Sequence, residues 1–195
     1  MPTGSGVRLI VGDAEGKGLP AVQQAATAMG TFRDAAHEEI TLSAIAARIE
    51  ATLDRVLTDE QFITAVLAEV NQDGSKIDMI NCGHPQPLKL GPEGPRLLGP
   101  AHGTLPLGFG ALATAERVPF TTTLGVDELV LFYTDGLSEA RNRAGEFFPV
   151  TECTSVQTPA DPSTLLERLS AEVSQHVRYR PHDDIGLLAV RRQTA

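Results

Sequence analysis

Two apolar runs joined by a short polar segment decide the fold of this chain: Phe62-Ile-Thr-Ala-Val-Leu-Ala-Glu-Val70, then Asn71-Gln-Asp-Gly74, then Lys76-Ile-Asp-Met-Ile-Asn-Cys82. Asn, Asp and Gly tolerate the backbone angles that a tight turn requires, and the flanking runs have the composition of strands. The segment therefore predicts a β-hairpin, and a hairpin pairs its strands antiparallel.

The elements expected around this hairpin place helices before and after a run of strands. Residues 41–57 carry apolar side chains at spacings of three and four, and Thr41 is a suitable N-cap. The other expected elements are a strand at 7–11, a helix from Leu19 to about Met29, strands at 88–90, 96–98, 116–123 and 128–134, a helix from Asp161-Pro162, and a strand at 185–190. This segregation indicates an α+β fold, with helices outside packed antiparallel sheets.

Length and composition suit one globular domain. The chain has 195 residues, of which 42% are apolar, and this is enough for a sizeable core. The first six residues, Met-Pro-Thr-Gly-Ser-Gly, are expected to be a disordered tail or an expression remnant. We therefore expect a single domain over residues 7–195.

The charge balance and the apolar runs exclude several classes of protein. Lys and Arg number 16 against 25 Asp and Glu, a net charge of −9, which argues against a general nucleic-acid binder. No run approaches the roughly 20 apolar residues of a membrane span, and the N-terminus lacks the features of a signal peptide. A cytoplasmic protein without membrane or nucleic-acid partners is expected.

Acidic residues stand at the ends of three predicted strands. Asp13 follows Leu9-Ile-Val-Gly, Asp135 follows Leu129-Val-Leu-Phe-Tyr-Thr, and Asp183-Asp184 precedes the last strand. Carboxylates at strand ends can converge on one rim of a sheet, where their mutual repulsion requires a cation. Oxygen ligands suit Mg²⁺ or Mn²⁺, and a pair of such ions can clamp a phosphate.

Other interpretations of these residues are open but less specific. Each Asp alone is a common turn or cap residue. Gly12-Asp-Ala-Glu-Gly-Lys17-Gly18 resembles a phosphate loop, yet it is one residue short and lacks the Ser or Thr that holds Mg²⁺. A glycine-rich turn between a strand and a helix is the simpler interpretation.

Three further features of the sequence point to weaker alternatives. Cys82 and His84 could bind zinc, but no second Cys/His pair accompanies them, so a buried thiol beside a structural His is favoured. His182-Asp183 is similar to a metal-binding dyad that sits among helices, whereas here it adjoins a strand. Ser138 lacks the Gly-x-Ser-x-Gly context of a nucleophile.

Seven blocks in a fixed order resemble one known family, the metal-dependent protein phosphatases (PPM, type 2C), and within it the SpoIIE-like serine phosphatases of bacteria. The blocks are Val11-Gly-Asp-Ala-Glu-Gly-Lys-Gly18, Phe62-Ile-Thr-Ala65, Asn81-Cys-Gly-His84-Pro-Gln-Pro-Leu88, Leu105-Pro-Leu-Gly108, Leu131-Phe-Tyr-Thr-Asp135-Gly-Leu-Ser-Glu-Ala-Arg-Asn142, Gly145-Glu-Phe-Phe148 and Asp183-Asp-Ile185. The resemblance covers residues 7–191.

This resemblance implies an α-β-β-α sandwich of two antiparallel sheets, with a two-metal site of Mn²⁺ or Mg²⁺. Asp13 would bridge the metals, the Ala14 carbonyl would bind one, and Asp135 and Asp183 would hold the other. Asp184 is a further candidate ligand. The resemblance also places Lys17, Gly16 and Gly136 where substrate binds. A metal-activated water would attack the phosphorus of a phosphoserine or phosphothreonine in line.

One family feature is missing from the sequence. Relatives carry a Gly-Gly-Asp-x-x-Asp strand upstream of the first block, whereas only six residues, none acidic, precede Val7. We therefore expect a sheet that lacks its N-terminal strand and has an open edge. Such an edge is commonly covered or paired, and a second copy of the chain could pair with it as a homodimer.

The resemblance implies a protein serine/threonine phosphatase whose substrate is a phosphorylated anti-sigma-factor antagonist in a stress or developmental switch. The missing strand motivates an alternative, a weakly active or inactive phosphatase-fold module that binds a regulatory partner protein. A phosphodiesterase acting on a small nucleotide is a more remote option.

Overall fold

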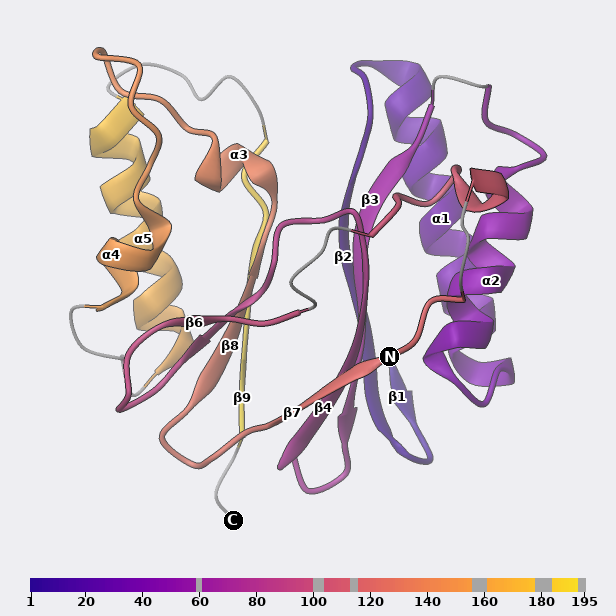
Figure 1. Ribbon diagram of the computed structural model, residues 1–195, viewed down its shortest axis with the longest axis horizontal. Helices are drawn as coiled ribbons and strands as arrows, with labels where there is room; N and C mark the ends of the chain where they lie inside the picture. The colour runs from indigo at the N-terminus through magenta and orange to yellow at the C-terminus, as the bar shows by residue number, and fades with distance from the viewer. Residues whose placement is uncertain (59–60, 100–103, 113–115, 156–160, 178–183, 193–195) are drawn as a thin grey trace. The chain divides into compact units, whose positions relative to one another are not determined.

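The computed structural model describes residues 1–58, 61–99, 104–112, 116–155, 161–177 and 184–192. The chain forms two compact units. The first unit comprises Met1–His84 and Gly99–Thr123, and the second comprises Pro85–Leu98 and Leu124–Ala195. Each unit joins one antiparallel sheet to its own helices (Figure 1).

The first unit is built on a five-stranded antiparallel sheet in the order β1-β2-β3-β4-β7. Its strands are β1 (Pro2–Thr3), β2 (Gly6–Ala14), β3 (Ile63–Asn71), β4 (Lys76–Cys82) and β7 (Phe120–Thr123). β3 and β4 are the predicted hairpin. Asn71 helps to close its turn, because its side-chain oxygen accepts the Lys76 amide at 3.0 Å.

Two helices pack on one face of this sheet, α1 (Leu19–Glu38) and α2 (Leu42–Leu53) (Figure 1). Thr41 caps α2 as predicted, since its Oγ1 accepts the Ala44 amide at 3.2 Å. α1 continues beyond the predicted end near Met29 because its buried face continues. The core between helices and sheet contains Phe32, Ala35, Ala36, Ile45, Ile49, Leu53, Ile63, Ala65 and Leu67.

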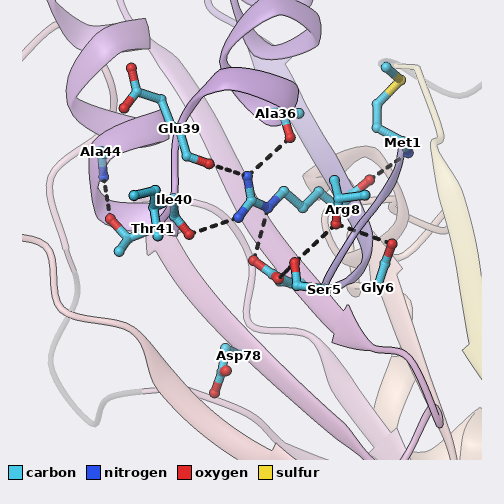
Figure 2. Close-up of polar contacts among 12 residues, drawn as sticks. Met1, Ser5, Gly6, Arg8, Ala36, Glu39, Ile40, Thr41, Ala44 and Asp78 are labelled. Carbon is cyan, nitrogen blue, oxygen red and sulfur yellow. Dashed lines mark hydrogen bonds and ion pairs between the residues drawn. The ribbon is translucent and has the colours of Figure 1, made fainter.

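A buried arginine joins β2 to the end of α1 (Figure 2). Arg8 is 4% exposed, and its guanidinium donates to the carbonyls of Ala36, Glu39 and Ile40 at 3.0, 2.6 and 2.8 Å. Its Nε also pairs with Glu69 of β3 at 2.9 Å. The last carbonyls of a helix have no partner within the helix, and Arg8 satisfies one of them, that of Ala36. Its bonds to the two residues that follow α1 also tie the end of this helix to the sheet.

The tail predicted for residues 1–6 is instead part of the sheet. β1 pairs with the start of β2, and Met1 exchanges two hydrogen bonds with Arg8. The Met1 ammonium donates to the Arg8 carbonyl at 2.7 Å, and the Arg8 amide donates back at 2.9 Å. A strand of two residues has no periodicity that a sequence pattern could reveal.

β1 is so short that most of β2 keeps an open edge, as expected from the sequence. Arg8 bonds on the β1 side of the strand, whereas the Glu15 amide donates to Phe62 on the β3 side at 3.0 Å. Backbone groups alternate along a strand, so those of Ile10 and Gly12 point away from β3. Within the described ranges, no group bonds to these two outward amides.

The second unit carries a four-stranded antiparallel sheet in the order β6-β5-β8-β9. Its strands are β5 (Leu88–Leu90), β6 (Arg96–Leu97), β8 (Leu129–Tyr133) and β9 (Leu187–Arg191), and its helices are α3 (Asp135–Ser138), α4 (Val150–Ser155) and α5 (Pro162–Val177). Asp161 caps α5 as predicted by accepting the Thr164 amide at 2.9 Å. The α5 stripe that includes Leu165, Leu169 and Val173 is buried in one core with the strands.

The predicted α+β class, with antiparallel sheets and helices, is confirmed. Besides β1, the helices α3 and α4 were not predicted, because four and six residues are too few to show a helical period. A 3₁₀ helix of three residues, Gly110–Leu112, was not predicted either. The single domain over residues 7–195 stays a prediction, since compactness within each unit does not test it. None of the helices in the described ranges is long and apolar enough to cross a membrane.

Candidate metal centre

Asp13 stands at the end of β2, in the first unit. It pairs with Thr64 of β3, and the next residue, Ala14, pairs with Ile63. The Asp13 carboxylate is half-buried, and its Oδ1 accepts the Ala14 amide at 3.0 Å. The strand end therefore fixes both the carboxylate and the backbone of Ala14, the two groups that the sequence assigns to metal binding.

A glycine-rich loop leads from this strand end into α1. Gly16 and Gly18 have φ values of 101° and 73°, which side-chain-bearing residues rarely adopt. Lys17 lies exposed between them, and the Gly18 carbonyl accepts the Val22 amide at 3.2 Å to open the helix. The predicted substrate residues Lys17 and Gly16 thus lie on an exposed turn next to Asp13.

Asp135 follows the fully buried strand β8, in the second unit. Thr134 holds this point against the start of β9. Its amide donates to the Gly186 carbonyl at 3.1 Å, its Oγ1 accepts the Gly186 amide at 2.8 Å, and the same Oγ1 donates to the Asp184 carbonyl at 3.0 Å. Asp135 and Asp184 are thereby brought to one end of the β8-β9 pair, as the sequence predicted.

One oxygen of the Asp135 carboxylate is buried and has no hydrogen-bond partner among the residues that the structure describes. A buried carboxylate oxygen without a partner is costly, because desolvation of the charge is not compensated. A cation would remove this cost, so the donor fits a metal. Gly136, the predicted substrate residue after it, is buried in the first turn of α3.

The remaining predicted ligands are described only in part. Asp184 is exposed, and Asp183 lies outside the described residues, as does His182. In the described part of the chain, no three His, Cys, Asp or Glu side chains form a group that could hold a metal. The complete ligand set therefore stays a prediction.

The weaker alternatives from the sequence gain no support. Cys82 is fully buried, and this burial raises the pKa of its thiol to about 12, so the thiolate that zinc requires is disfavoured. Ser138 lies in α3 and donates to the Asp135 carbonyl at 3.4 Å. Sequence reasoning missed the clamp of Thr134, since its partners are 50 residues and more away in the chain and only the strand pairing reveals them.

The chain matches the family model described as stage II sporulation protein E (SpoIIE) over residues 3–193, and no curated protein matches it. It is similar in structure to the RsbU and RsbW domains of Rv1364c from Mycobacterium tuberculosis, with 23% identity and a TM-score of 0.76 over 95% of this chain and 53% of that one.

Two phosphatase structures are also similar. The PP2C phosphatase domain of SpoIIE from Bacillus subtilis, with a fragment of its regulatory domain, gives 18% identity and a TM-score of 0.81 over 94% of this chain and 54% of that one. The catalytic domain of the serine threonine protein phosphatase PstP, in complex with two manganese ions, gives 11% identity and a TM-score of 0.63 over 93% of this chain and 86% of that one. At these identities the likeness shows the fold alone. The chain spans about half the length of the Rv1364c and SpoIIE structures.

Proposed function

Because the chain belongs to the stage II sporulation protein E family, as its motifs predicted, we propose that it is a metal-dependent protein phosphatase acting on phosphoserine or phosphothreonine. The observation that supports this proposal is the buried Asp135 oxygen that no group in the described part of the chain satisfies. A structural Asp at the start of a helix commonly accepts a backbone amide. A buried carboxylate oxygen that accepts no hydrogen bond from the described residues is suited to a cation.

Oxygen donors define the metals that fit. We propose that Asp13, the Ala14 carbonyl, Asp135 and Asp183 hold two Mn²⁺ or Mg²⁺ ions, with Asp184 as a further ligand. Such ions polarise a phosphoryl oxygen and make a bound water acidic enough to be a nucleophile at neutral pH. The chain itself would orient the carboxylates through the β2 end and the Thr134 clamp, and Lys17, Gly16 and Gly136 would bind the phosphorylated side chain. The manganese ions in the PstP structure support the metal class.

The proposed substrate is a phosphorylated antagonist of an anti-sigma factor, in a cytoplasmic switch. Its support is the family membership together with the likeness to a structure that joins RsbU and RsbW domains. A panel of phosphoproteins of this class, compared with unrelated phosphoserine peptides, tests the preference. Binding of such a partner at saturating Mn²⁺ without phosphate release would favour the alternative, a binding module.

Phosphate release from a phosphoserine peptide tests the activity. After EDTA treatment, added Mn²⁺ or Mg²⁺ should restore release by the wild-type chain, and Asp135→Asn should lower the rate at least about 100-fold. Asp127→Asn is the matched control, because Asp127 is exposed in a turn of the same unit. Metal-dependent release that survives in Asp135→Asn would refute the assignment.

A further inference from the structure

Three polar side chains form a row across the first sheet where β2 ends. Asp13 and Thr64 are direct partners of the antiparallel β2-β3 register, so their side chains lie on the same face. On the far side of Thr64, its Oγ1 lies 2.9 Å from Nδ1 of His84, just beyond the end of β4. The strands β2, β3 and β4 follow one another in the sheet (Figure 1). The register and the Thr64–His84 contact therefore make Asp13, Thr64 and His84 consecutive across it.

The turn that carries His84 is closed by its own side chains. The Asn81 side chain accepts the His84 amide and donates to the His84 carbonyl, both at 2.8 Å. Thr104 Oγ1 donates to the Asn81 carbonyl at 2.6 Å and accepts the Gly83 amide at 3.1 Å. These four bonds fix the backbone on both sides of the imidazole, which leaves its ring in one place against Thr64.

Gly83 shows that this turn is built for close packing. It has φ 69°, and a Cβ there would lie 2.7 Å from Cγ of Pro106. Only glycine therefore allows the turn to approach residue 106 while His84 contacts Thr64. His84 is itself 6% exposed, and this burial favours a positioning role for its ring over direct contact with substrate.

We propose that Thr64 and His84 are positioning residues for the Asp13 carboxylate, with His84 acting through the Thr64 hydroxyl. A hydroxyl can donate one hydrogen bond and can accept another from a neighbour. Contact with the fixed imidazole sets the direction of the Thr64 hydroxyl, and this hydroxyl faces the same side of the sheet as Asp13. Groups that orient metal-binding carboxylates commonly change metal affinity 10–100-fold when they are removed. This inference rests on the proposed function, in which Asp13 binds the metal.

Paired substitutions isolate the hydroxyl and the ring nitrogen. Thr64→Val removes the hydroxyl and keeps the shape, whereas Thr64→Ser keeps the hydroxyl. His84→Asn keeps a polar group at the position of Nδ1, whereas His84→Gln moves it away. Calorimetric titration of the full chain with Mn²⁺ gives the dissociation constant without any substrate.

We expect Thr64→Val and His84→Gln to raise the Mn²⁺ dissociation constant about 10–100-fold. Thr64→Ser and His84→Asn should stay within about threefold of the wild type, and the double variant Thr64→Val/His84→Gln should bind no more weakly than Thr64→Val alone, because both act through one hydroxyl. Thr122→Val is the matched control, since Thr122 is a buried threonine of β7 in the same sheet. It should leave Mn²⁺ binding unchanged.

The positioning role is wrong if folded Thr64→Val binds Mn²⁺ as the wild type does, or if Thr122→Val weakens binding equally. Asp13→Asn separates this failure from that of the proposed function. If the wild type binds no Mn²⁺, or if Asp13→Asn binds it equally well, the metal site itself is wrong and the positioning role falls with it.

Discussion

Glu128, at the turn before β8, shows how one carboxylate makes stability depend on pH. It accepts the Gly125 amide at 2.7 Å and pairs with Lys89 at 2.8 Å. Burial opposes its ionised form, but the hydrogen bonds from Lys89 and Gly125 outweigh burial and hold the pKa of Glu128 below its usual value. The ionised form is therefore more favourable in the folded chain than in the unfolded chain.

We predict that Glu128→Gln lowers the free energy of unfolding by about 1 kcal/mol at pH 7. The wild-type contribution is complete above the ordinary glutamate pKa of about 4.3 and is lost as the pH falls through the lower pKa of the folded state. Urea unfolding of both proteins between pH 7 and 3 measures this. Glu167→Gln, at an exposed position of α5, is the control. An equal difference between wild type and Glu128→Gln at pH 7 and pH 3 would contradict the prediction.

Single residues of the candidate site could be predicted only where they stand at strand ends. Asp13 and Asp135 each follow an apolar run, so the sequence pattern marks them. Thr64 and Thr134 lie next to such ends without any pattern of their own. Their roles depend on the register that places Thr64 opposite Asp13 and on the bonds that tie Thr134 to residues 184 and 186. The sequence pattern contains neither the register nor these long-range hydrogen bonds.

At the scale of elements, α2 holds a loop through one buried carboxylate. Glu50 is 8% exposed, its Oε1 accepts the amides of Gly108 and Gly110, both at 2.7 Å, and its Oε2 pairs with Arg117 at 2.8 Å. The loop in turn pairs with the start of β3, where Leu107 and Ile63 exchange two hydrogen bonds at 2.9 Å. Glu50 thus joins a helix, a loop and a strand.

We predict that Glu50→Gln destabilises the chain by about 3 kcal/mol, because it leaves a largely buried guanidinium without its counter-charge. Glu38→Gln makes the same chemical change in a pair with the more exposed Arg48, and should cost no more than about 1 kcal/mol. Urea unfolding at pH 7 compares the two. If both variants lost the same free energy of unfolding, burial of the Glu50–Arg117 pair would not increase its contribution to stability.

Helices and strands were predicted correctly where they are long enough to show a hydrophobic period or are joined by a recognisable turn. α2 and α5 have apolar stripes and side-chain caps, and β3-β4 has a turn sequence, so each was identified with nearly correct bounds. α3 and α4 are held by tertiary contacts and carry no stripe. β7 begins at Phe120, inside the predicted strand, because pairing with β4 begins at the partners Met79 and Phe120. The end of a strand is decided by its neighbour as well as by its own residues.

At the scale of the whole molecule, the proposed metal ligands are divided between two parts of the chain. Asp13 and the glycine loop belong to the first unit, and Asp135 and Asp184 belong to the second. Local patterns could mark the acidic residues of each unit separately, because no periodicity connects residues more than 120 positions apart. The order of the seven blocks identified the family, and the family match over residues 3–193 confirmed it.

The open edge of β2 gives the molecule a measurable signature in hydrogen–deuterium exchange. The amides of Leu9 and Val11 face β3, whereas those of Ile10 and Gly12 face outward. We predict that Ile10 and Gly12 exchange at least about 100-fold faster than Leu9 and Val11, because protection follows the free energy needed to open each bond. Nuclear magnetic resonance after transfer to deuterated water resolves the four amides.

Uniformly slow exchange along this strand would contradict that alternation and would mean that the edge is occupied in solution. Slowing that grows with protein concentration would then identify a second copy of the chain as the occupant. The exchange rates of the Ile10 and Gly12 amides thus report whether the chain is monomeric in solution.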